Sequence, residues 1–353
     1  MVLLDDESPY GSRRVVVECD GQTTAAYLHD GGGAIAATWV ASHCPAPPTV
    51  DLAMLSSGQA PLMPAGHTKH PLGRPLLDPG ALSALWLEEG DGVVVLEHGT
   101  PIAVLPGWSD MSSRMPGYAS DIIGQTPFGW ALDPAMEGLG PRIAAARRFW
   151  EWRSDAATWA AFRQAVFGHL LARLGPGGKY WDVSGGRQPL VGVSERPATA
   201  QRPYTVLSTV GMSCQRMPVI EQAGDTAAGR ARIELALATT MPSAAAARVF
   251  LWLAQYPWRE VTWLGSGHSV PWYHEPGTFP LGGGYAAVLL LDEPDALLGP
   301  EVPLLPGFTV SGAPVRWLWL VPITERERLL AAERGSASLV THLAAQRRSW
   351  VTG

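Results

Sequence analysis

The first 140 residues alternate between short apolar runs and turn residues, a pattern that predicts β-strands. Runs rich in valine and alanine are separated by turns that contain glycine and aspartate, such as Asp20-Gly21. The predicted strands are residues 15–19, 24–29, 34–40, 82–88, 93–97 and 101–105. The last three form a meander, which can bury one face. Residues 45–79 are rich in proline and are expected to be irregular.

From residue 141 onward the apolar spacing becomes helical. We expect helices at 141–148 and 155–174, the second capped by Ser154 and ended by the glycines and proline of 175–178. Its apolar stripe recurs at three- and four-residue steps. The stripe consists of Trp159, Phe162, Val166, Leu170 and Leu174. This change of pattern predicts a β-rich N-terminal domain of uncertain role over 1–140 and a second domain over 141–353.

The second domain combines nearly continuous apolar runs with short helices. The runs at 281–291 and 315–321 suit central strands that are covered on both faces. Further strands are predicted at 204–212 and 231–239, and helices at 244–256, after Thr324, and from Ser336 or Ser338 toward Gln346. Glu327 stands three residues after Thr324, as in a capping box. The whole pattern predicts an α+β (mixed α/β) fold in two lobes.

Composition narrows the class of protein. A chain of 353 residues with 46% hydrophobic and 16% charged residues can form about two domains with real cores. The net charge is −6, and Lys69 and Lys179 are the only lysines, so no basic block is present. Nucleic acid is therefore not expected as a partner, because phosphate binding requires clustered Lys and Arg.

Three cysteines without metal-ligand spacing, and an acidic N-terminus without an apolar signal region, favour a reducing cytoplasm. No apolar run approaches the ~20 residues that a membrane helix requires. We therefore expect a cytoplasmic protein that does not insert into membranes. The oligomeric state cannot be predicted from these features.

Candidate catalytic and metal-binding residues are few. His67 and His70 stand three apart, but the surrounding prolines disfavour the helix that would make them a metal pair. His268, His274 and Glu275 form a second loose group. Neither group completes a catalytic set, and no glycine-rich loop has phosphate-binding spacing. We predict no catalytic residues, no metal and no cofactor. These histidines nevertheless leave open an enzyme or accessory factor in peptide or natural-product modification.

Aromatic residues gather between positions 252 and 274, within a total of 15 tryptophans. Most tryptophans are expected in cores, but Trp, Tyr and Arg are also the residues that dominate binding surfaces. The candidate partner-binding residues are Trp258, Arg259, Trp263, His268, Trp272, Tyr273 and His274.

Five short patterns occur in a fixed order between Tyr204 and Leu343. They are Ser208-Thr209-Val210-Gly211-Met212-Ser213, Arg232-Ile233-Glu234-Leu235-Ala236-Leu237, Gly265-Ser266-Gly267-His268-Ser269-Val270-Pro271-Trp272, Gly284-Tyr285-Ala286-Ala287-Val288-Leu289-Leu290-Leu291 and Val315-Arg316-Trp317-Leu318-Trp319-Leu320-Val321-Pro322-Ile323-Thr324-Glu325-Arg326-Glu327. This order resembles the suppressor of fused family over residues 145–353. Residues 1–140 show no comparable resemblance.

The resemblance implies central mixed sheets flanked by helices and a function in holding other proteins. In bacterial relatives it implies an immunity protein that neutralises a toxin by occlusion, which is our leading hypothesis for a bacterial member. A regulatory scaffold that sequesters a transcription factor is the alternative implied by animal relatives. The expected partner is a protein, either a toxin or a peptide segment.

Overall fold

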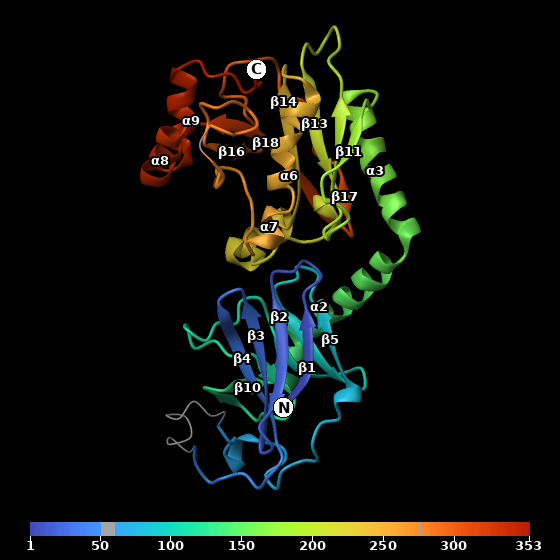
Figure 1. Cartoon of the computed structure of the whole chain (residues 1–353), viewed down its shortest axis with the longest axis vertical. Coiled ribbons are helices and arrows are strands. Elements are labelled where there is room, and N and C mark those ends of the chain that lie inside the picture. Colours follow the sequence, from blue (N-terminus) through green and yellow to red (C-terminus); the bar gives the residue numbers. More distant parts are fainter. Residues whose placement is uncertain (51–60, 276) are drawn as a thin grey trace. The chain divides into compact units, whose positions relative to one another are not determined.

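The structure is a computed structural model that describes residues 1–50, 61–275 and 277–353 (Figure 1). The chain forms two compact units, Met1–Asp155 and Ala156–Gly353. The boundary predicted between 140 and 141 lies inside a helix, α2 (Leu132–Ser154). Residues 51–60, part of the predicted irregular stretch, lie outside the described residues.

The N-terminal unit contains two sheets. The first is antiparallel in the order β1 (Val2–Glu7), β2 (Arg14–Cys19), β3 (Thr23–Asp30) and β4 (Gly33–Ser42). The second has the order β5 (Leu82–Trp86), β6 (Val93–Glu97), β7 (Thr100–Leu105), β8 (Tyr118–Ala119), β10 (Gly129–Ala131) and β9 (Gln125–Thr126). Both predicted strand groups are confirmed. The edge strand β1 was not predicted, because of its six residues only Leu3 is buried.

Strand β6 shows why this unit has a continuous apolar run at its centre. Val93 and Val95 belong to the core shared with the first sheet. Val94 and Leu96 belong to a second core, together with residues of α2. Because successive side chains of a strand point to opposite faces, a strand covered on both faces must be apolar throughout.

Helix α2 differs from its prediction. It begins at Leu132 and continues through Pro141 to Ser154, whereas the sequence pattern predicts a helix that begins at Pro141 and ends at residue 148. Ser154, predicted to cap the next helix, ends α2 instead, and its hydroxyl donates to the carbonyl of Glu151 (2.7 Å). Helix α3 (Ala156–Leu174) follows with the expected stripe, of which Trp159 is half-buried and the other four residues are buried.

The C-terminal unit is built on one mixed sheet (Figure 1). Its path is β11 (Tyr180–Asp182), β12 (Gly192–Arg196), β13 (Thr205–Val210), β14 (Arg232–Thr239), β18 (Ala313–Ile323), β16 (Ala287–Leu291) and β15 (Ser269–Pro271), with β17 (Thr309–Val310) paired to β18. Strands β14 and β18 are parallel, and the other neighbours are antiparallel. The predicted α+β fold with mixed sheets is confirmed.

Helices flank this sheet. They are α3, α4 (Ala227–Arg230), α5 (Ser243–Ala246), α6 (Arg248–Leu253), α7 (Tyr256–Arg259), α8 (Glu325–Arg334) and α9 (Ser336–Ala345). The single helix predicted over 244–256 is broken into α5, α6 and the start of α7, and Pro257 stands in the first turn of α7. The strand predicted from 281 begins at Ala287, because the three preceding glycines form turns.

Candidate functional site

Two of the family-like patterns meet at a buried carboxylate. Glu234 on β14 is fully buried below the turn that follows β13. Its carboxylate accepts from the Thr209 hydroxyl (2.6 Å), the backbone N–H groups of Gly211 and Ser213 (3.0 Å each) and the Ser213 hydroxyl (2.7 Å). Burial raises the pKa of Glu234, and these four hydrogen bonds oppose the rise.

Gly211 allows this turn to form. Its φ is +128°, a conformation that side chains rarely adopt, and a Cβ there would stand 2.3 Å from the carbonyl oxygen of Leu190. The turn continues as a 3₁₀ helix, Met212–Cys214. Arg232, two residues before Glu234, donates to the carbonyls of Ser213 (3.1 Å) and Cys214 (2.9 Å). These patterns therefore build the interior of the unit, and their side chains do not present a surface.

A cluster of aromatic rings carries three of the predicted partner-binding residues. The ring of Trp272 lies 5.2 Å from Trp252, 4.5 Å from His274 and 5.7 Å from Phe279, between ring centroids. Trp252 also contacts Tyr256 (6.3 Å). We call Trp252, Tyr256, Trp272, Tyr273, His274 and Phe279 the aromatic face.

The aromatic face is partly open to solvent. Tyr273 is 71% exposed and His274 is exposed, whereas Phe279 is buried beneath them. Burial, and a side-chain hydrogen bond with Tyr273, raise the pKa of Tyr256. Arg259 is exposed on the same short helix as Tyr256. The guanidinium of Arg259, the exposed phenol of Tyr273 and the packed indoles of Trp252 and Trp272 thus occur within one small region.

The other predicted residues lie elsewhere. Trp258 is fully buried and its indole N–H donates to the carbonyl of Arg216 (3.0 Å), so its side chain belongs to the core. Trp263 and His268 form a separate pair of half-buried rings with centroids 4.4 Å apart. Burial lowers the pKa of His268.

The histidines proposed for an enzyme are occupied by other contacts. His67 Nδ1 lies 3.2 Å from the carbonyl of Ile123, and His70 Nδ1 lies 2.5 Å from the buried carboxylate of Asp121. His268 and His274 pack on different tryptophans. Among the described residues, no three histidines, cysteines or acidic residues gather closely enough to hold a metal ion.

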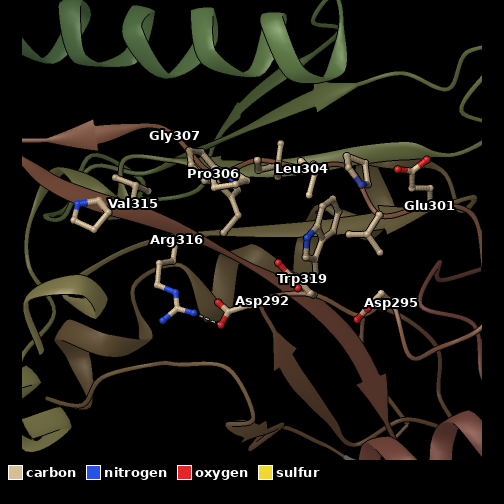
Figure 2. A pocket seen from close by; sticks show the side chains of 15 residues that line it. Asp292, Asp295, Glu301, Leu304, Pro306, Gly307, Val315, Arg316 and Trp319 are labelled. Carbon is tan, nitrogen blue, oxygen red and sulfur yellow. Dashed lines mark hydrogen bonds and ion pairs between the residues drawn. The ribbon is translucent and has the colours of Figure 1, made fainter. Parts of the chain in front are cut away.

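A pocket of about 430 Å³ lies beside β18, and sequence reasoning missed it (Figure 2). Asp292, Glu293, Asp295 and Glu301 line it, and we call it the acidic pocket. The signal in the sequence is the position of Asp292 and Glu293 directly after an apolar strand, ahead of the proline-rich stretch 300–306.

Residues 186–353 match the family model described as suppressor of fused protein (SUFU). This region is therefore similar to the suppressor of fused family, as the order of its motifs predicted.

Two solved structures are similar to this chain. One is a SUFU homologue from Neisseria gonorrhoeae FA 1090, with 17% identity over 54% of this chain and 93% of that chain and a TM-score of 0.36. The other is the Sufu–Fu complex, with 13% identity over 51% of this chain and 82% of that chain and a TM-score of 0.35. No curated protein sequence matches the chain. No helix in its described part has the length and apolarity needed to cross a membrane.

Proposed function

We propose that this protein binds another protein through the aromatic face. The observation that carries the proposal is Tyr273, 71% exposed beside a packed set of rings on the C-terminal unit. Aromatic and arginine side chains supply most of the binding energy of protein interfaces. The match to the suppressor of fused family supports the same role.

Packing prepares the aromatic face for binding. Trp272 contacts Trp252, His274 and Phe279, so its ring is held in place before a partner arrives. Its indole N–H also donates to the Thr278 hydroxyl (3.2 Å). A surface that is already ordered loses little side-chain entropy on association, and more of the contact energy becomes affinity.

The finer proposal is that the partner is a toxin and that this protein is its immunity protein in a bacterial cytoplasm. Neutralisation would follow from occlusion. A stable interface buries roughly 1,600 Å² in total, enough to cover the active site of a small enzyme. The aromatic face would supply the centre of that interface, and Arg259 a charged position at its rim.

A pull-down with the proteins encoded beside the gene tests this proposal. Wild-type protein should retain one neighbour, and co-expression should protect cells from the toxicity of that neighbour. Tyr273→Ala should weaken binding by about ten-fold or more, as is typical of a residue central to an interface. Leu171→Ala, which removes a 55% exposed apolar side chain on α3, is the matched control.

The outcomes separate the levels of the proposal. If no neighbour binds and none is toxic, the immunity role is lost. If a DNA-binding regulator is retained instead, the protein is a sequestering scaffold. If a partner binds equally well to the wild type and to Tyr273→Ala, the aromatic face is not the docking site.

A further inference from the structure

A second pocket lies wholly within the N-terminal unit and has a volume of about 530 Å³. This volume falls in the range of pockets that enclose small ligands. Strands β8, β9 and β10 and the first turn of α2 contribute to it. We call it the N-terminal pocket, and its lining consists of Lys69, Tyr118, residues 122–125, Trp130, Ala131 and residues 133–135.

Two aromatic rings form an apolar side of the N-terminal pocket. Tyr118 on β8 and Trp130 on β10 are partners in a parallel strand pair, and their ring centroids lie 5.7 Å apart. Trp108 packs against both rings, 5.8 Å from Tyr118 and 6.2 Å from Trp130. All three side chains are half-buried, so their neighbours fix the rings while part of each surface stays open. Rings that are already ordered lose little entropy when a flat ligand stacks on them.

Another part of the lining is fixed through the main chain. Residues 67–69 pair with residues 121–123 in an antiparallel arrangement, through main-chain hydrogen bonds of 2.8 and 2.9 Å. Ile122 in this pairing is 1% exposed and belongs to the core of the unit. Lys69 therefore projects from a rigid segment, and the pocket is formed before a ligand arrives.

The charged groups of the N-terminal pocket neutralise each other. Lys69 Nζ and a carboxylate oxygen of Asp133 lie 2.6 Å apart. Their side chains are 41% and 69% exposed, so both groups keep room for further hydrogen bonds. Among the described residues no other charged side chain lines the pocket, and its lining therefore carries no net charge. A phosphate or an ammonium group would meet only a counter-charge that is already paired, so the pocket favours a ligand without net charge.

The stacking surface and the polar groups together define the class of ligand. A ligand that is apolar throughout would remove water from Lys69 and Asp133 and return no hydrogen bond. A pyranose sugar satisfies both parts of the pocket, because it has C–H groups on its faces and hydroxyls around its edge. Each hydroxyl both donates and accepts. The Asp133 carboxylate accepts only, the Lys69 ammonium donates only, and the Gln125 amide does both, so neighbouring hydroxyls find complementary groups.

We propose that the N-terminal pocket binds a neutral pyranose sugar. One face of the sugar ring stacks on Tyr118 and Trp130, and its hydroxyls form hydrogen bonds with Lys69, Asp133 and Gln125. The pocket lies outside residues 186–353, the part of the chain that matches the family model. The proposal therefore gives the N-terminal unit a binding role of its own, which does not depend on protein binding by the aromatic face.

Titration of the full chain with simple glycosides tests the proposal. The probes are the methyl pyranosides of glucose, galactose, mannose and N-acetylglucosamine. The control is tetrahydropyran-2-methanol, which keeps the ring but lacks the ring hydroxyls. The readout is the indole N–H resonance of Trp130 in ¹⁵N-labelled protein, assigned by its loss in Trp130→Phe. We expect a saturable shift with at least one glycoside, with a dissociation constant on the order of 1 mM, and no saturable shift with the control.

Variants localise the binding. Lys69→Ala and Asp133→Ala should each weaken the binding of that glycoside by about ten-fold, because each removes a charged hydrogen-bond partner. Glu137→Ala, at an exposed position of α2 that does not line the pocket, is the matched control. All three variants should melt close to wild type, since an exposed ion pair contributes little to stability. If Trp130→Phe does not fold, a crystal grown with the glycoside locates it, with the sugar ring within about 4 Å of Trp130.

Three results would overturn the proposal: no saturable shift with any of the four glycosides, equal binding of the control, or equal binding by the Lys69 and Asp133 variants. Adenosine that binds more tightly than every glycoside would do the same, because it would assign the pocket to flat aromatic bases. The pull-down described above and this titration use different units of the chain, so the two proposals fail separately.

Discussion

At the scale of single residues, Glu234 shows how a motif can be diagnostic of a family and yet structural. Its carboxylate receives four hydrogen bonds from the turn after β13, and that turn depends on Gly211 at φ +128°. The sequence supported a strand end at Ser208–Ser213, and the structure has one there. The sequence could not reveal this contact, because Gly211 follows β13, Glu234 lies on β14, and no local pattern links them.

Glu234→Ala should lower the free energy of unfolding by about 3 kcal/mol, because it leaves buried N–H and O–H donors without acceptors. Glu234→Gln should cost clearly less, since its amide oxygen can still accept from the turn. Urea unfolding followed by circular dichroism measures both, with the exposed Glu333→Ala as the control. Equal losses for Ala and Gln would show that the hydrogen bonds do not stabilise the turn.

His268 should make the C-terminal unit sensitive to acid. Burial lowers the pKa of His268 in the folded state, so the unfolded chain binds more protons as the pH falls below about 6.5. Stability is therefore complete above that pH and is lost as the pH falls toward the lowered value. Melting temperatures of wild type and His268→Phe between pH 7.5 and 5.5 should diverge, the wild type falling more. Parallel curves would contradict this explanation.

At the scale of elements, the local signals were reliable where the residues at the start of a helix form their own capping hydrogen bonds. Thr324 and Glu327 form both hydrogen bonds of a capping box at the start of α8, as their spacing predicted. Proline was less reliable. Pro141 stands inside α2 and does not begin it, and Pro257 lies in the first turn of α7, a separate helix that the sequence pattern did not predict.

Thr324→Ala should destabilise the C-terminal unit by about 1 kcal/mol, because it removes the side-chain acceptor for the Glu327 N–H. Thr324→Ser keeps that acceptor and should stay within a few tenths of wild type. Hydrogen exchange at the first-turn amides of α8 measures the local effect. Faster exchange in both variants alike would mean that the methyl group of Thr324, and not its oxygen, supports the helix.

At the scale of the whole molecule, neither the sheet topology nor the position of the acidic pocket could be predicted from the sequence. The parallel pair β14 and β18 lies about 80 residues apart in the chain, and nothing in either strand specifies the other. The acidic pocket lies along β18 beyond the end of β16. Its position therefore also depends on strands that are far apart in the chain. The sequence shows that aromatic residues gather between positions 252 and 274. It does not show which of them are exposed, so the burial of Trp258 could not be predicted.

Partner binding should weaken as salt rises. The net charge of −6 and the carboxylates of the acidic pocket favour a basic partner, and salt screens such attraction. Binding of the captured partner should therefore be several-fold weaker at about 0.5 M than at about 0.05 M salt, mainly through a slower association rate. Surface plasmon resonance measures the rates, and a salt-independent association rate would argue that contacts with the aromatic face alone determine the encounter.

One wall of the acidic pocket, residues 300–306, is anchored through its carbonyl oxygens and does not depend on which side chains it carries. Those oxygens are contacted by the side chains of Trp350, Tyr204, His169 and Arg173. Substitutions at Glu301 or Leu304 would therefore change the chemistry of the pocket while the scaffold keeps its shape. The lining can then diverge one mutation at a time, without first passing through an unstable intermediate.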